Sequence, residues 1–336
     1  MSRLHVGVIS LIVSFFAVFV STSTAFALTV SPAKLEITGD PGTTVYGDIE
    51  VFNEQADTKV FYSSFENFEP AGDSGSPHFI GAKDGLATWM QTSESITLFP
   101  SQREKIPFTI TIPEGTEPGG YFSALFWGSS APEQTGVGGE VSIGGKIGVL
   151  ILLRVSGNVE EDAGILDFGT KEQQRAFTSL PIHFTYRMNN DGGDRIVPLG
   201  DVTIKNTIRL TSETLSANKN EGSVLPGSIR KFESVWGDDS ALAKETGFIS
   251  SVKHQWKEFH VGWYTANLHV VWGETNTVEE ESFHFFIFPW QLLLILLVII
   301  STVGFFAKIG IKKYNTWIIA KATMAQPPVA KPKRKK

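Results

Sequence analysis

A period of two in the apolar residues dominates the middle of this chain. In the segments 43–53, 106–112 and 202–210, apolar side chains alternate with polar ones. This alternation is typical of β-strands that bury one face. Helical periodicity is almost absent between Leu28 and His284, and Gly, Pro, Asn and Asp separate the strands. We therefore expect an all-β body built from sandwiches, and not from alternating strands and helices.

The body also contains an internal repeat. The segments 119–125 and 262–268 both read G-x-Y-x-(S/A)-x-L. Two further pairs of segments recur upstream in the same order, 98–101 with 224–227 and 51–53 with 186–189. Three landmarks in one order predict two copies of one module. We place two tandem immunoglobulin-like β-sandwich domains at residues 28–158 and 159–284. The border follows a strand at 147–155 that is apolar on nearly both faces, as a central strand would be.

Both ends of the chain carry an apolar segment. Residues 1–27 read as a signal peptide, because Arg3 precedes an apolar run and Ala25-Phe26-Ala27 fits a cleavage site. Residues 285–307 contain no charged side chain, and a helix of this length crosses a bilayer core of about 30 Å. We expect four residues to mark its membrane interfaces, Trp290 on one side and Lys308, Lys312 and Lys313 on the other.

Residues 308–336 form a basic tail, and positive charge beside a span favours the cytoplasmic side. We therefore expect a single-pass type I protein of the cell membrane, with the body outside the cytoplasm and the tail inside. The formal net charge of −6 divides accordingly, because every acidic residue lies between Leu28 and Pro289. An acidic body argues against nucleic-acid binding. The absence of cysteine excludes disulfides and thiolate metal sites.

The first module carries motifs that resemble a known family. It opens with Val30-Ser31-Pro32 and Pro41-Gly42, and it closes with the segment 113–121, PEGTEPGGY. In this order, the motifs resemble those of bacterial surface proteins with tandem immunoglobulin-like ectodomains, in particular the WxL-interacting protein family. The resemblance implies one domain associated with peptidoglycan, a second associated with host or partner proteins, and a C-terminal membrane helix. The Pro/Gly/Asn pattern is also similar to that of pilus-chaperone N-terminal domains, which are soluble.

No catalytic motif stands out, so we expect a binding protein and not an enzyme. The sequence has no H-E-x-x-H and no G-x-S-x-G. Two segments are candidate contact elements, 66–89 and an insertion at 237–260 that the first module lacks. Within them, the candidate partner-contact residues are Trp89, His254, Trp256 and His260. For the two histidines, a metal-binding or pH-sensing pair is the alternative to ordinary loop residues.

No cofactor is expected. The cluster 189–194, NNDGGD, offers oxygen ligands but lacks the spacing of an EF-hand loop. Such clusters are typical of turns between strands. A structural cation near Asp191 and Asp194 is the alternative.

These features together predict a membrane-anchored bacterial cell-envelope protein. Its two immunoglobulin-like domains would serve binding, adhesion or scaffolding outside the cell. The expected partners are the cell membrane and either a cell-wall polymer or a surface protein. Two alternatives stay open: an accessory ectodomain subunit of a membrane complex, and an envelope-polymer hydrolase with two carboxylates about 5–10 Å apart in a cleft.

Overall fold

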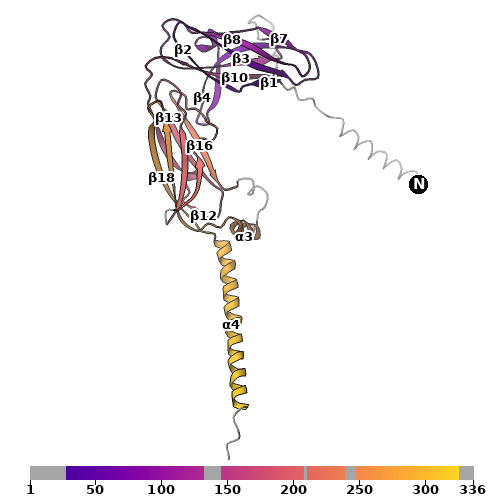
Figure 1. Cartoon of the computed structure of the whole chain (residues 1–336), viewed down its shortest axis with the longest axis vertical. Coiled ribbons are helices and arrows are strands. Elements are labelled where there is room, and N and C mark those ends of the chain that lie inside the picture. Colours follow the sequence, from indigo (N-terminus) through magenta and orange to yellow (C-terminus); the bar gives the residue numbers. More distant parts are fainter. Residues whose placement is uncertain (1–27, 132–144, 208–209, 239–246, 325–336) are drawn as a thin grey trace, which may run out of the picture. The chain divides into compact units, whose positions relative to one another are not determined.

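The computed structural model describes residues 28–131, 145–207, 210–238 and 247–324 (Figure 1). The predicted signal peptide and the end of the basic tail lie outside the described residues. Strands dominate the described chain, and one long helix follows them. The prediction of a mainly β protein with immunoglobulin-like sandwiches and one apolar C-terminal helix is confirmed.

The chain divides into two compact units that interleave along the sequence. Unit 1 comprises Met1–Gly164, Met188–Ile196 and Ser223–Arg230, and unit 2 comprises Ile165–Arg187, Val197–Gly222 and Lys231–Lys336. The two consecutive domains predicted at residues 28–158 and 159–284 stay a prediction.

Two sheets of unit 1 share one hydrophobic core. Their strand orders are β1-β3-β8-β6 and β2-β10-β9-β4-β5, and β7 pairs with β4 as well. Trp127, Phe61 and Phe108 are among the largest side chains in this core, and all are fully buried. The elements are β1 (Leu28–Ser31), β2 (Lys34–Gly39), β3 (Thr44–Asn53), β4 (Lys59–Ala71), β5 (Ser76–Gly81), α2 (Leu86–Trp89), β6 (Met90–Thr92), β7 (Ser95–Leu98), β8 (Arg103–Thr111), β9 (Gly119–Gly128) and β10 (Lys146–Val155).

The later strands form a three-stranded sheet, β11-β13-β16, and a five-stranded sheet, β12-β18-β17-β14-β15. Phe184 of β13 and Phe285 of β18 meet with ring centroids 5.5 Å apart, so aromatic side chains join these two sheets. The elements are β11 (Ala163–Thr170), the 3₁₀ turn η1 (Lys171–Gln173), β12 (Ala176–Phe177), β13 (Ile182–Asn190), β14 (Leu199–Asn206), β15 (Thr211–Ser216), β16 (Ser228–Trp236), α3 (Phe248–Lys257), β17 (Gly262–Trp272), β18 (Thr277–Ile287) and α4 (Trp290–Met324).

The apolar helix begins later than the sequence predicts. The predicted segment starts at Phe285, but Phe285 and Ile287 belong to β18 and are fully buried. Their alternation with exposed or half-exposed residues continues the strand, and α4 begins at Trp290, directly after Pro289. Hydrophobicity alone does not distinguish a buried strand from the first turn of an apolar helix, which explains the difference.

Two buried asparagines mark the internal repeat. Asn53 ends β3, and its side-chain Nδ2 donates a hydrogen bond to the carbonyl oxygen of Leu98 over 3.1 Å. Asn190 ends β13, and its Nδ2 donates to the carbonyl oxygen of Val224 over 2.8 Å. Both side chains are completely buried. The sequence comparison aligned Asn53 with Asn189, but the structural equivalent is Asn190, because the alternation along β13 turns this residue inward.

The residues that follow Pro100 and Pro226 form a second repeated contact. The backbone N–H of Ser101 donates to the carbonyl oxygen of Asn53 over 2.9 Å, and that of Gly227 donates to Asn190 over 2.7 Å. Ser101 has a φ of 59° and Gly227 a φ of 65°. Both positions therefore require the left-handed backbone region, which favours glycine.

Replacing Ser101 by glycine is therefore expected to raise the free energy of unfolding by about 0.5 kcal/mol. The left-handed conformation costs a non-glycine residue about 1–2 kcal/mol, and the greater freedom of glycine in the unfolded chain offsets about 0.5–1 kcal/mol of this gain. Urea unfolding checks the result, with Gly227→Ser as the reciprocal variant that should lose stability. A loss of stability in Ser101→Gly would contradict the assignment.

Candidate functional site: the uncovered edge of strand β10

Strand β10 has two halves with different neighbours. Along its whole length it pairs antiparallel with β9, from Lys146 opposite Gly128 to Val155 opposite Gly119. On its other side it pairs in parallel with β2, but only from Leu150 onward. Within the described parts of the chain, the stretch 146–149 therefore has a strand partner on one side only.

The open side of this stretch presents backbone groups. The N–H of Leu150 donates to the carbonyl oxygen of Ala33 over 3.0 Å, so the backbone groups of Leu150 point toward β2. Because backbone groups of a strand point alternately to its two sides, those of Gly148 and Lys146 point to the same side, beyond the end of the β2 pairing. Unpaired strand-edge groups are a template for another strand.

The side chains around this edge include both apolar and charged residues. Ile147 is 38% exposed, whereas Val149 and Ile151, which continue the same row, are fully buried. The ammonium of Lys146 forms an ion pair with Glu66 and lies 4.3 Å from the centroid of the Phe126 ring. A lysine on an edge strand limits uncontrolled pairing with other chains. The edge thus combines an accessible apolar residue with a charged one that restricts access.

Gly148 has a specific role in the middle of this edge. A Cβ atom at this position would lie 2.6 Å from Cδ1 of Phe126 and 2.9 Å from the carbonyl oxygen of Leu125. Only glycine lets the Phe126 ring lie against the strand.

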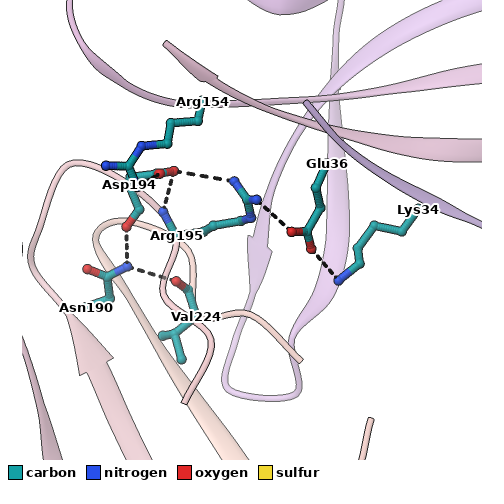
Figure 2. A network of polar contacts seen from close by, with 7 residues as sticks. All are labelled: Lys34, Glu36, Arg154, Asn190, Asp194, Arg195 and Val224. Atoms are coloured by element: carbon teal, nitrogen blue, oxygen red, sulfur yellow. Dashed lines mark hydrogen bonds and ion pairs between the residues drawn. The ribbon is translucent and has the colours of Figure 1, made fainter. Parts of the chain in front are cut away.

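An ionic network fixes the other end of β10 (Figure 2). Nη1 of Arg154 on β10 lies 3.1 Å from Oδ2 of Asp194, whose Oδ1 accepts the backbone N–H of Arg195 over 2.7 Å. Nη2 of Arg195 donates to Glu36 on β2 over 2.8 Å. Lys34 completes the chain of contacts, with its Nζ 2.7 Å from Glu36. Asp194 is only 7% exposed, so the network is partly buried.

The network ties the turn after β13 to β2 and β10. Asn190 stabilises the network by hydrogen bonds, since its Nδ2 donates to the carbonyl oxygens of Asp194 and Val224, each over 2.8 Å (Figure 2). The backbone N–H of Gly120, on the neighbouring strand β9, donates to the carbonyl oxygen of Gly193 over 3.0 Å. Residues 150–155 of β10 are therefore held by β2, by β9 and by the ionic network. Residues 146–149 continue from this well-anchored part of the strand and pair only with β9 within the described residues.

The network also shifts the titration of Glu36. Burial alone would raise the pKa of Glu36, but hydrogen bonds and charges from Lys34 and Arg195 outweigh burial, and the pKa lies below its ordinary value of 4.5. A carboxyl group with a lowered pKa in the folded state stabilises the protein above its unfolded-state pKa. This contribution is lost as the pH falls through the folded-state pKa.

We therefore expect Glu36→Gln to remove an acid-sensitive part of the stability. The wild type should exceed the variant at about pH 6, and the difference should shrink as the pH falls below about 4.5. Urea unfolding of both proteins across this range measures it. A difference that stays constant from neutral to acidic pH would contradict the assigned role of the carboxylate.

The predicted partner-contact residues belong to both units. Trp89, in unit 1, is half-buried, and its ring centroid lies 4.8 Å from that of Tyr121. In unit 2, Trp256 is 73% exposed. Nε2 of His254 lies 2.8 Å from the carbonyl oxygen of Leu180, and the His260 ring packs on Trp236 with centroids 4.8 Å apart. Partner contact by these residues stays a prediction.

Of the predicted membrane-interface residues, Trp290 begins α4, and Lys308, Lys312 and Lys313 follow on the same helix. Residues Trp290–Ile319 form a helix that is long and apolar enough to cross a membrane. From Trp290 to Ala307, before the first lysine, the helix spans about 27 Å, close to the thickness of a bilayer core.

The predicted cation near Asp191 and Asp194 stays a prediction. Asp194 faces the guanidinium groups of Arg154 and Arg195, and Asp191 accepts a hydrogen bond from Nδ2 of Asn189 over 2.6 Å. Across the described residues, no three histidine, aspartate or glutamate side chains gather in a way that could hold a metal ion.

The sequence matches no protein-family model and no curated protein. Solved structures similar to this chain include the class 5 fimbriae chaperone CfaA, at 10% identity over 78% of this chain and 100% of that chain, with a TM-score of 0.35. Another is the Salmonella enterica SafA pilin in complex with the SafB chaperone, at 10% identity over 79% of this chain and 99% of that chain, with a TM-score of 0.35. A third is a PapD-like domain of human CEP192, at 15% identity over 41% of this chain and 94% of that chain, with a TM-score of 0.29. At these values the likeness concerns the sandwich architecture alone.

These comparisons correct several predictions. The resemblance to the WxL-interacting protein family is wrong, since the structural neighbours are fimbrial chaperones and PapD-like domains. The prediction of an adhesin or scaffold that binds a cell-wall polymer or a surface protein is wrong for the same reason, and neither alternative function is favoured. Short turn motifs are shared among many immunoglobulin-like folds, which explains the error. The expectation of a non-enzymatic binding protein agrees with chaperone neighbours.

Proposed function

We propose that this protein holds an extended segment of another polypeptide by β-strand addition to the uncovered edge of β10, as a chaperone-like binding protein. The observation that carries the proposal is the half-covered β10, whose pairing with β2 begins only at Leu150. A segment laid along 146–149 would continue the path of β2 and pair with the backbone groups of Lys146 and Gly148.

The chemistry of the edge defines the partner segment. Backbone hydrogen bonds supply affinity in strand addition, and pockets for alternate side chains supply specificity. Ile147 offers an apolar contact beside the edge, and the Lys146–Glu66 ion pair borders it. We therefore propose a segment in which apolar and polar residues alternate. Two of the neighbours are described as chaperones in complex with a pilin or a tip adhesin, which is consistent with a polypeptide ligand.

We further propose that α4 crosses the cell membrane once, with the two immunoglobulin-like sandwiches in tandem outside the cytoplasm and the basic tail inside. The apolar stretch of Trp290–Ile319 and the lysines that begin at Lys308 support this topology. In this arrangement the strand-binding edge would meet polypeptides that have been exported.

An array of ten-residue peptides tests the binding function. The full-length protein in detergent should bind peptides with alternating apolar and polar residues, and it should bind scrambled peptides of the same composition more weakly. Equal binding of alternating and scrambled peptides would contradict strand addition, because the pairing of alternate side chains requires the period of two.

A matched pair of variants locates the binding edge. Lys146→Pro removes the side chain and the backbone N–H that points to the open side, whereas Lys146→Ala removes the side chain alone. We expect a loss of affinity of about tenfold in the proline variant beyond the effect of alanine, which corresponds to one hydrogen bond of about 1.4 kcal/mol. Fluorescence anisotropy with the tightest peptide measures both. Equal affinities of the two variants would place the binding edge elsewhere.

A further inference from the structure

In unit 2, a buried glutamine of helix α3 forms hydrogen bonds with the beginning of α4. Gln255 is only 2% exposed. Its Oε1 accepts the backbone N–H of Leu292 over 3.0 Å, and its Nε2 donates to Oε1 of Gln291 over 2.5 Å. The first N–H groups of a helix lack partners within the helix, so Gln255 caps α4. The position of α3 is therefore set relative to the first turn of α4 (Figure 1).

Apolar side chains extend this contact at both ends of α3. The rings of Phe248 and Trp290 have centroids 6.1 Å apart. At the other end, a hollow of about 300 Å³ is lined only by apolar residues, Trp256, Phe259, Leu292, Leu293 and Leu296. The two helices thus share an apolar surface, and this surface is open.

Two large apolar side chains on one face of α3 are strongly exposed. Ile249 is 78% exposed and Trp256 is 73% exposed. These residues are seven apart, so they lie on the same face of the helix. Around the start of α4, Trp263, Phe288 and Trp290 are also exposed by 62%, 48% and 44%. A contiguous group of exposed apolar side chains marks an interaction surface, whereas isolated ones do not.

The position of this group indicates what it contacts. Trp256 shares a hollow with Leu292 in the first turns of α4, the one helix in the described chain that is long and apolar enough to cross a membrane. Tryptophan prefers the interface between the apolar core and the lipid head groups. An amphipathic helix with basic residues beside its apolar face lies in that interface, and α3 carries Lys253 and Lys257 beside Ile249 and Trp256.

We propose that α3 lies in the interface of the lipid bilayer, with Ile249 and Trp256 turned toward the acyl chains. The apolar face of α3 and the first turns of α4 then form one continuous lipid-binding surface. The capping contact of Gln255 keeps this surface in register with α4. The inference rests on the proposed crossing of the membrane by α4, and it is independent of the strand-binding edge on β10.

The absence of cysteine from the natural chain allows a direct test with single-cysteine variants. The full-length protein carries a polarity-sensitive fluorophore at one of four positions and is reconstituted into phosphatidylcholine–phosphatidylglycerol vesicles with nitroxide-labelled lipid. Ile249→Cys and Trp256→Cys report on α3, and Ile300→Cys reports on α4. Val278→Cys is the matched control, because this residue is 54% exposed and is the second residue of β18, about 30 Å along the strand from the end that leads to α4.

We expect the labels at 249 and 256 to shift to shorter wavelength and to be quenched most by nitroxides near the head groups. The label at 300 should be quenched most by nitroxides near the ends of the acyl chains, and the label at 278 should respond to neither. If 249 and 256 behave like 278 while 300 is quenched, α3 lies in water and the inference is overturned with the span intact. If 300 is not quenched either, the proposed topology fails as well.

Discussion

Replacing Asn53 by leucine is expected to lower the free energy of unfolding by about 3 kcal/mol. Asn53 is completely buried, and its side chain satisfies the backbone of two loops. It donates to the carbonyl oxygens of Asp57, Leu98 and Phe99 and accepts the backbone N–H of Gln55. Leucine has a similar size but cannot pair with these groups, and each buried polar group left unpaired costs about 1–3 kcal/mol.

The repeat supplies a matched control for this prediction. Asn190→Leu should lose a comparable amount, because Asn190 is equally buried and bridges two loops in the same way. Asn189→Leu, one position away, should change the stability by less than about 1 kcal/mol, since Asn189 is only half-buried. Urea unfolding followed by tryptophan fluorescence measures all three. Equal losses at positions 189 and 190 would contradict the equivalence of Asn53 and Asn190.

Replacing Asp194 by alanine is expected to cost about 3 kcal/mol. The variant removes the buried carboxylate that faces the guanidinium groups of Arg154 and Arg195, and the loss of one partner from a buried ion pair costs more than the absence of the whole pair. The turn after β13 would then lose its charged contact with β10, and the base of the strand-binding edge would loosen (Figure 2).

A double-mutant cycle separates this charge effect from a general loss of packing. The double variant Asp194→Ala, Arg154→Met should be more stable than Asp194→Ala alone, because it also removes the guanidinium group that has lost its ion pair with Asp194. Additive losses in the cycle would show that Arg154 and Asp194 do not interact. Since Asp194 is almost completely buried, added salt should change the result little.

The strands were predictable from the sequence because a period of two is a local signal. The segments 43–53 and 106–112 overlap β3 and β8, which pair with each other in the structure. The uncovered edge of β10 was not predictable in this way. Its sequence is apolar on nearly both faces and predicted a central strand, yet β2 covers only its C-terminal part. Where a partner strand begins depends on contacts between residues far apart in the chain, and a single sequence does not contain this information.

In the candidate site, too, local features were predictable from the sequence and long-range contacts were not. The cluster 189–194 predicts a turn between strands, and the structure places there the end of β13 followed by bends at residues 192–194. Its charged partners Arg154 and Glu36 come from distant strands, and no local pattern could have indicated them. Trp89 and Trp256 both have polar sequence neighbours, but Trp89 packs against Tyr121 whereas Trp256 is exposed. Polar neighbours therefore did not distinguish a half-buried tryptophan from an exposed one.

Amide hydrogen exchange of β10 tests the central claim most directly. The full-length protein is measured with and without the tightest peptide of the alternating array. We predict that the amides of Lys146 and Gly148 exchange at least about tenfold more slowly with the peptide bound, because both become hydrogen-bonded to an added strand. The amides of β5, the strand at the opposite edge of the same sheet, should stay unchanged. Protection along β5, with Lys146 and Gly148 unaffected, would contradict the account.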